Sequence, residues 1–372
     1  MATLRGEPVD RPAVNFYEIG GFDIDRADDD PFNIYTDPSW RTLLDLAEDE
    51  TDIIRMRCAR TTPAPDNPSA ELFKAEERIE DGSRLTRTTV TCGGRTLTSL
   101  SRRDPDVDTV WEIEHLLKDV DDAKSYLELP DEVFDYEVDV SNLVAEDKAL
   151  GDRGIVMVDQ ADPICHAAGL FSMADYTVMA LTEPRLFHRI LEKWSRPLME
   201  RTETIAAAFP GHLWRVVGAE YATPPYLPPR LFEEYVVRYT GPMVEAIERH
   251  GGFARIHCHG RIREVLPHFV KMGASGTDPI EPPPQGNVEL SYVRKEYGRD
   301  LVLFGNIEVA DIETLDPPAF EKKCAQSLAD GTRDDGRGFV LMPTACVYGR
   351  KVSPTAMKNY ETIVRLAKAW RP

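Results

Sequence analysis

Two histidines, placed two residues apart at the end of an apolar run, are the side chains best suited to chemistry. The segment Phe253 to Gly260 reads FARIHCHG and has the character of a strand leading into a helix. Successive side chains of a strand point to opposite faces, so His257 and His259 are expected to share one face, with Cys258 on the other. Two imidazoles arranged in this way can bind a single metal ion.

Two further ligand types follow other apolar runs. Glu220 comes just after the run 213–218, and Cys346 comes after the run 339–342. With His257 and His259 they supply one carboxylate, two imidazoles and one thiolate, a set that zinc accepts. The residue types alone equally fit hydrogen-bonded pocket histidines and a small buried cysteine, so both interpretations stay open at this point.

The elements that must position these residues alternate between short apolar strands and long amphipathic helices. This alternation is typical of an α/β fold with a parallel sheet and helices outside it. No GxGxxG follows the first strand, so a dinucleotide fold is not indicated, and an open doubly wound sheet is the alternative. Eight strands predict a (βα)8 TIM barrel. The strands are expected at 13–17, 53–56, 155–158, 213–218, 253–257, 276–278, 301–305 and 339–342, with helices at 40–48, 174–181, 185–208, 229–250, 261–272, 288–297, 319–329 and 354–370.

Active sites of βα barrels lie at the C-terminal ends of the strands, so polar residues there are the candidates for function. Asp278 and Glu281 follow one strand and are either a second acid pair or braces that orient a histidine. We assign the catalytic candidates as Glu220, Tyr221 and Asp278, the substrate-binding candidates as His166, Tyr348, Arg261 and Glu281, and the metal ligands as Glu220, His257, His259 and Cys346.

A hairpin is predicted near the N-terminus, outside the barrel. Thr and Val alternate with polar residues from Arg84 to Arg102, around the turn Cys92-Gly93-Gly94. Gly-Gly between two alternating runs is a strong hairpin signal. We therefore expect one barrel domain over 1–372, with a hairpin and helical extension at about 80–150 within it.

The acidic composition of the chain indicates which kinds of partner it can bind. The net charge is −20, with 64 acidic residues against 44 basic ones, which argues against nucleic acid and anionic membrane surfaces. The six cysteines show no CxxC spacing, and the chain has neither an apolar leader nor a long apolar run. A cytoplasmic protein with reduced thiols that acts on a small-molecule substrate is expected. A homo-oligomer is compatible with the sequence.

Several segments together resemble the uroporphyrinogen decarboxylase superfamily, and within it the zinc-dependent methyltransferases that work with corrinoid proteins. The resemblance covers nearly the whole chain and supports the barrel. It is carried by Arg5 to Pro12, by Trp111 to Asp119 with Leu127 to Pro130, by the turn Gly305-Asn306-Ile307-Glu308, and by Phe339 to Cys346 with Ser353 to Met357.

The resemblance implies methyl transfer between a small methoxy, hydroxy or thiol compound and a corrinoid (cobalamin) on a partner protein. The family's zinc ligands, His-x-Cys and a later Cys, match His257 and Cys346, but His259 stands where a cysteine is expected. Asp162 and His166 lack the DxHxxG spacing of a corrinoid-binding protein, hence the separate partner. The alternatives are a decarboxylase or lyase for a small carboxylated substrate and a non-catalytic tetrapyrrole-binding barrel.

Overall fold

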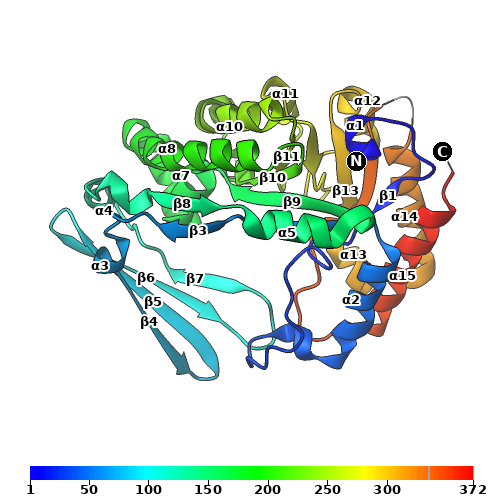
Figure 1. Ribbon diagram of the computed structural model, residues 1–372, viewed down its shortest axis with the longest axis horizontal. Coiled ribbons are helices and arrows are strands. Elements are labelled where there is room, and N and C mark those ends of the chain that lie inside the picture. The colour runs from blue at the N-terminus through cyan, green and yellow to red at the C-terminus, as the bar shows by residue number, and fades with distance from the viewer. Residues whose placement is uncertain (334–335, 372) are drawn as a thin grey trace.

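The computed structural model describes residues 1–333 and 336–371 and contains an eight-stranded parallel sheet that curls round on itself (Figure 1). β1 pairs with β14, and across the gap between β1 and β2 the Asp52 N–H donates to the Val14 carbonyl oxygen at 2.7 Å. The predicted TIM barrel is therefore confirmed. The strand order is β1 (Ala13–Val14), β14 (Phe339–Pro343), β13 (Val302–Ile307), β12 (Gly276–Asp278), β11 (Phe253–His257), β10 (Leu213–Val217), β9 (Gly154–Ala161) and β2 (Ile53–Arg57).

The inside of the barrel is apolar toward one end and charged toward the other. Because strand side chains alternate, Val302 and Phe304 both point inward and join an apolar cluster of interior side chains. The same alternation places Arg215 inside, two residues beyond the buried Leu213. The charged side chains thus follow the apolar ones in the direction of the strands' C-terminal ends.

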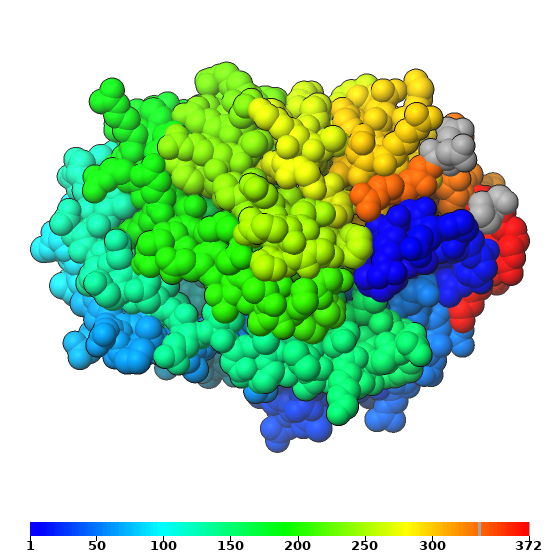
Figure 2. Space-filling model, turned by 45° about the horizontal axis from the view of Figure 1, so that its top comes forward, coloured from blue at the N-terminus to red at the C-terminus, as the bar shows by residue number. Residues whose placement is uncertain are grey.

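The N-terminal helix α1 (Ala2–Arg5) closes the opposite end of the barrel. Its Leu4 is buried in the interior cluster. Figure 2 shows the first residues packed among segments from the middle and the end of the chain. A cavity of about 510 Å³ lies here, lined by Leu4 and by Gly154, Leu213 and other strand-starting residues. In βα barrels this end serves stability rather than catalysis, so we place no site there.

Helices surround the sheet, and several begin at an Asp or Ser that is followed by proline. Asp37, Asp316 and Ser353 each accept a backbone N–H in the first turn of their helix, and the following proline needs no donor there. The α-helices are α2 (Pro38–Glu50), α3 (Ser69–Leu72), α4 (Val120–Leu127), α5 (Ser141–Leu150), α6 (Pro163–Gly169), α7 (Met173–Thr182), α8 (Pro184–Ala208), α9 (Arg230–Phe232), α10 (Arg238–Arg249), α11 (Leu266–Lys271), α12 (Leu290–Tyr297), α13 (Val309–Thr314), α14 (Pro317–Gly331) and α15 (Pro354–Ala369). Short 3₁₀ turns are η1 (Ile34–Thr36), η2 (Asp131–Phe134), η3 (Gly151–Arg153) and η4 (Ala219–Ala222), and the π-helical turn η5 (Glu233–Val237) leads into α10.

Two predicted boundaries are wrong. The strand predicted over 13–17 ends at Val14, because Tyr17 adopts a φ of 60° and the Asn15 side chain accepts its N–H. The helix predicted over 261–272 begins only at Leu266, since Pro267 has no N–H to give and is tolerated only in a first turn.

The predicted hairpin is present within a four-stranded antiparallel sheet beside the barrel (Figure 1). Cys92 pairs with Arg95 around Gly93 and Gly94, whose φ values are 52° and 74°. Positive φ at both turn residues suits a two-residue hairpin and favours glycine. The sheet consists of β4 (Phe73–Glu80), β5 (Ser83–Cys92), β6 (Arg95–Arg103) and β7 (Val110–Glu114), and a separate pair joins β3 (Arg60–Pro63) with β8 (Tyr136–Asp139).

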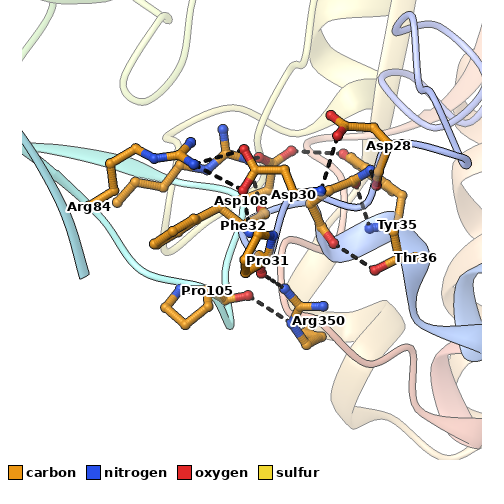
Figure 3. Close-up of polar contacts among 12 residues, drawn as sticks. Asp28, Asp30, Pro31, Phe32, Tyr35, Thr36, Arg84, Pro105, Asp108 and Arg350 are labelled. Carbon is orange, nitrogen blue, oxygen red and sulfur yellow. Dashed lines mark hydrogen bonds and ion pairs between the residues drawn. The ribbon is translucent and has the colours of Figure 1, made fainter. Parts of the chain in front are cut away.

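Polar contacts fasten this sheet to the end of the barrel (Figure 3). Arg84 of β5 pairs with Asp30 at 2.9 Å. Arg350, which follows β14, donates through Nε to the Pro105 carbonyl oxygen at 2.8 Å and through Nη2 to the Pro31 carbonyl oxygen. The loop that carries Cys346 is therefore tied to the turn between β6 and β7.

Substituting each hairpin glycine in turn separates the backbone strain of a positive φ from a steric clash with α4. A Cβ on Gly93 would lie 2.7 Å from the Ser125 Cα, whereas a Cβ on Gly94 would meet nothing within 4 Å. Gly94→Ala is expected to cost about 1 kcal/mol from positive φ alone, and Gly93→Ala clearly more. Urea denaturation of both variants checks this expectation, and equal costs would contradict the packing of α4 against the turn.

Among the described residues, no helix combines the length and apolar character needed to cross a membrane.

Candidate active site

An arginine and a tyrosine form the buried floor of the C-terminal mouth of the barrel. Arg215 donates through Nε and Nη2 to the two carboxylate oxygens of Asp159, at 2.6 and 2.9 Å. Its Nη1 donates to the Tyr17 hydroxyl. Burial raises the pKa of Tyr17 well above its ordinary value, with the negative charge of Asp278 adding to the effect, so the phenol stays protonated. Strand β10 is thereby linked to the segment that follows β1, beneath the mouth.

His257 ends β11 and is held from one side of its ring. Its Nδ1 lies 2.8 Å from Asp278 Oδ2 and 3.3 Å from the Tyr17 hydroxyl. Because an ionised carboxylate only accepts, the proton of the neutral imidazole belongs on Nδ1, and Nε2 keeps its lone pair. The Nε2 atom has no hydrogen-bond partner among the described residues. This is the orientation in which a histidine binds metal.

Asp278 is ionised despite complete burial. Its carboxylate is 0% exposed, and Oδ1 forms an ion pair at 2.9 Å with Nε of the equally buried Arg255. Burial would raise the pKa of Asp278, but the positive charge of Arg255 and the hydrogen bond from His257 Nδ1 outweigh it and bring that pKa down to about 2. Asp278 therefore acts as a fixed acceptor for His257 rather than as a proton donor.

His259 repeats the arrangement with a second carboxylate. Its Nδ1 lies 2.7 Å from Glu281 Oε1, and Glu281 Oε2 accepts the Gly260 N–H at 2.5 Å. Partial burial lowers the pKa of His259, but the hydrogen bond and charge of Glu281 outweigh it, and the pKa ends above its ordinary value. The His257 and His259 rings lie 4.6 Å apart between centroids, at 85°. The prediction that the two histidines lie together is confirmed.

The other predicted ligands differ in their surroundings. Glu220, on η4, has a buried Oε2 without a hydrogen-bond partner among the described residues. Its negative charge helps to raise the pKa of His259. Cys346 is buried, which raises the pKa of its thiol well above the ordinary value, and its charged neighbours are Glu18 and Asp108. Within 1–333 and 336–371 no three His, Cys, Asp or Glu side chains already form a metal-holding group.

The remaining predicted residues lie in other surroundings. Tyr221 packs edge-on against Tyr176, and burial, with the charges of Cys165 and Glu220, raises the pKa of Tyr221 to about 12. His166 stacks on Trp194 at 4.2 Å between ring centroids, and burial lowers its pKa to about 4. Tyr348 and Arg261 are exposed. Contact of these four side chains with a substrate stays a prediction.

Four residues of the site were not predicted from the sequence: Tyr17, Asp159, Arg215 and Arg255. Arg255 stands two residues before His257, so the alternation that paired the histidines also places this arginine on their face. A charged residue in a buried strand is unusual enough to be a signal in itself. Tyr17 offered no such signal, because its position depends on a turn that ends β1.

A profile of the family described as uroporphyrinogen decarboxylase (URO-D) matches residues 110–370. The chain belongs to the uroporphyrinogen decarboxylase family. A methyltransferase from Methanosarcina mazei has a similar solved structure, with a TM-score of 0.57, 14% identity, and coverage of 99% of this chain and 96% of that one. A D-psicose 3-epimerase from Clostridium cellulolyticum H10 is a weaker match, with a TM-score of 0.33, 11% identity, and coverage of 65% and 84%. No curated protein matches significantly.

In this member of the uroporphyrinogen decarboxylase family, both interior arginines are already neutralised. Arg215 pairs with Asp159, and Arg255 pairs with Asp278. A carboxylate-rich substrate needs cations that are free to receive it. Within the described interior of the barrel, the charges of both arginines are therefore already balanced by carboxylates of the same chain.

Asp162 should make stability depend on pH. It is fully buried, and burial raises its pKa to about 7, although hydrogen bonds from the Cys165 N–H and the Thr240 hydroxyl lower it. Because the folded pKa exceeds the unfolded value near 3.8, the folded state holds more protons between the two values. Stability should therefore fall as pH rises from about 4 to about 7, on the order of a few kcal/mol.

Asp162→Asn removes this titration. Chemical denaturation at several pH values should give a flatter stability profile than the parent protein over the same interval. Asp316→Asn is the matched control, since Asp316 also caps a helix but is exposed. An unchanged profile in Asp162→Asn would show that other groups produce the dependence.

Proposed function

We propose that this protein is a zinc-dependent methyltransferase that moves a methyl group between a small methoxy, hydroxy or thiol compound and a corrinoid carried by a partner protein. The observation that carries the proposal is the pair of histidines at the barrel mouth, each fixed through Nδ1 by a carboxylate, with each Nε2 left without a hydrogen-bond partner in the described part of the chain. The family membership and the fold shared with a methyltransferase support the same chemistry. The corrinoid and its carrier rest on the family resemblance.

The donor types of the proposed ligands suit a zinc ion. His257 and His259 would each contribute Nε2, and Glu220 would contribute the oxygen that has no partner among the described residues. Cys346 remains the proposed fourth ligand. Bound zinc would supply a Lewis acid that makes a substrate oxygen or sulfur a better nucleophile or leaving group.

The protein's own side chains would then hold the site in shape. Asp278 and Glu281 fix the two rings in one tautomer and one orientation, so no rotation is needed on binding. Tyr17 and Arg215 close the floor beneath His257. A histidine where thiolate-rich relatives have cysteine makes the ligand set harder, which favours an alkoxide, phenolate or carboxylate oxygen over a thiol.

The decarboxylase alternative has weaker support in this barrel. A substrate with several carboxylates needs unpaired cations, whereas Arg215 and Arg255 are both ion-paired inside the described barrel. A non-catalytic tetrapyrrole-binding barrel would have no use for two carboxylate-oriented histidines. Methyl transfer is therefore the function that the site supports best.

Metal analysis of the purified protein, combined with a methyl-transfer assay, tests the proposal. Elemental analysis should find about one zinc per chain, removable by chelation and restored by added zinc. Free cobalamin, supplied as reduced cob(I)alamin to accept a methyl group or as methylcobalamin to donate one, can stand in for the carrier, and its visible absorbance reports the transfer from methoxy-bearing compounds or to hydroxy- and thiol-bearing ones. Absence of zinc, together with metal-independent release of CO₂ from a carboxylated compound, would establish the decarboxylase instead.

A further inference from the structure

The outer edge of the four-stranded sheet is uncovered. β4 is the outermost strand, and β5 is its one hydrogen-bonded neighbour among the described strands. Figure 1 shows β4 on the side of the sheet that lies away from the barrel. Every residue of β4 after Phe73 is exposed, and 59% of the Ile79 surface is accessible. An uncovered edge strand can pair with a strand of another chain.

The shape of β4 does not prevent such pairing. The strand is eight residues long, contains no proline, and pairs with β5 without a bulge from Phe73 to Glu80. The opposite edge strand, β7, is only five residues long, and its register with β6 shifts between Leu100 and Ser101. Natural edge strands avoid pairing by being short, by bulges, by proline or by repelling charges. For β4, the charges therefore decide whether a second strand can pair.

The turn that joins β4 to β5 determines which backbone groups of β4 point outward. Glu80 and Ser83 flank the two-residue turn 81–82, whose φ values are 50° and 81°. Residues that flank such a turn form a hydrogen-bonded pair, and every second residue along the strand repeats this pairing. The residues between them direct their N–H and C=O groups away from β5. These outward-directed residues are Ala75, Glu77 and Ile79.

The charges of β4 are self-complementary in one antiparallel register. Side chains of alternate residues share a face, and on one face of β4 their charges alternate in sign, in the order Lys74, Glu76, Arg78 and Glu80. When two copies pair antiparallel about Glu77, Lys74 lies opposite Glu80 of the second copy. Glu76 then lies opposite Arg78. These are the non-hydrogen-bonded positions, where the Cα atoms approach to about 4.5 Å and opposite charges stabilise the pairing.

The neighbouring registers set like charges against each other. Pairing about Glu76 would place Lys74 opposite Arg78. Pairing about Arg78 would place Glu76 opposite Glu80. Like charges directly opposite one another destabilise a strand pair, so the register about Glu77 is favoured over both.

We propose that β4 pairs with β4 of a second copy of this chain, antiparallel and two-fold symmetric about Glu77, so that one continuous sheet joins the two copies. At the axis the two Glu77 carboxylates meet, and each has Arg84 of its own chain as a counter-ion at 3.4 Å. Ile79 lies opposite Ala75 of the second copy and loses part of its exposure to water. A two-fold dimer requires the same self-complementary surface on both copies, which this edge provides. The proposal does not rest on methyl transfer.

The dimer should be weak. Two paired strands bury less area than the about 1,600 Å² of a standard protein interface, and each exposed ion pair contributes little. The net charge of −20 on each copy adds a general repulsion, which about 0.15 M salt largely screens. A dissociation constant of about 1–100 µM is therefore expected.

Sedimentation velocity of the full-length protein at about 1–200 µM and about 0.15 M salt measures this dimer. Arg78→Glu and Glu76→Arg each set like charges opposite one another, so each variant alone should weaken the dimer at least about tenfold. Mixed in equal amounts, the two variants should form a heterodimer about as tight as the parent dimer, because every opposed pair again carries opposite charges. Lys322→Glu, an exposed position on α14, makes the same change in net charge away from β4 and should leave the dimer unchanged.

Three outcomes would overturn the proposal. The parent protein would be a monomer at about 200 µM, well above the expected dissociation constant. The mixture of Arg78→Glu and Glu76→Arg would remain as monomeric as either variant alone, although both substitutions are at exposed positions that the fold tolerates. Both variants and Lys322→Glu would dimerise as the parent protein does, which would place the interface on another surface.

Discussion

Replacing His257 by alanine is expected to lower zinc affinity, and any zinc-dependent methyl transfer, by more than about a hundredfold. Removal of a partner that only orients a ligand already costs 10- to 100-fold, so removal of the ligand itself should cost more. Nε2 of His257 is the atom that Asp278 leaves available, and no other described side chain hydrogen-bonds to it. Competition with a chromophoric chelator measures zinc affinity without any assumption about the substrate.

His115→Ala is the matched control for this variant. His115 is half-buried, its Nδ1 lies 3.5 Å from the Gly169 carbonyl oxygen, and no hydrogen bond or ring contact joins it to the described residues of the barrel mouth. Zinc affinity should be unchanged in this variant. If His257→Ala also binds zinc as tightly as the parent protein, the histidine pair is not the metal site, and the proposed function loses the observation that carries it.

Asp278→Asn is expected to destabilise the protein by about 3–5 kcal/mol, because it leaves Arg255 charged, buried and without its partner. Arg255 is 1% exposed and packs over the Phe304 ring at 4.8 Å, so water cannot easily replace the lost carboxylate. Because the pKa of Asp278 is lowered to about 2, its ionised form stabilises the fold fully above the unfolded value near 3.8, and this contribution is lost as the pH falls toward 2. Denaturant titration near neutral pH measures the loss.

Two comparisons separate this effect from a general loss of charge. Asp45→Asn breaks the exposed pair between Arg26 and Asp45 and should cost less than about 1 kcal/mol. Arg255→Met combined with Asp278→Leu removes both buried charges and should recover most of the stability lost in the single variant. If Asp278→Asn were as stable as the parent protein, the buried ion pair between Arg255 and Asp278 would be contradicted.

Asp278→Asn should also weaken zinc binding 10- to 100-fold if the metal site is correctly assigned. The amide can still accept or donate near His257 Nδ1, but it no longer selects the tautomer that leaves Nε2 free. The stability loss and the affinity loss have different causes. The double variant that restores stability should therefore leave zinc binding weak.

The eight strands and the glycine hairpin were predictable because their signals are local. Apolar runs such as 253–257 match β11 at both ends, and the Gly93-Gly94 turn defines the pairing of Cys92 with Arg95. The side-by-side placement of His257 and His259 was also predictable, since alternation along a strand needs no knowledge of the rest of the chain.

Partners from distant segments were harder to predict. Alternation shows which face His257 occupies, but it does not show that Asp278 would orient that histidine or that Tyr17 would lie below it. The false helix over 261–265 is a different kind of miss, because Pro267 is a local signal that restricts the helix start to the turn containing it. The surroundings of Cys346 depend on Glu18, from the other end of the chain.

Periodicity and turn chemistry in the sequence alone determined the eight strands, the hairpin and the face shared by the two histidines, because these depend on neighbours a few residues apart. Only the tertiary structure decided which carboxylate holds which histidine and that the two arginines of the described barrel interior are paired with carboxylates. The physical reason is that hydrogen bonds and ion pairs depend on distances between side chains, and strand ends far apart in sequence meet only when the sheet closes.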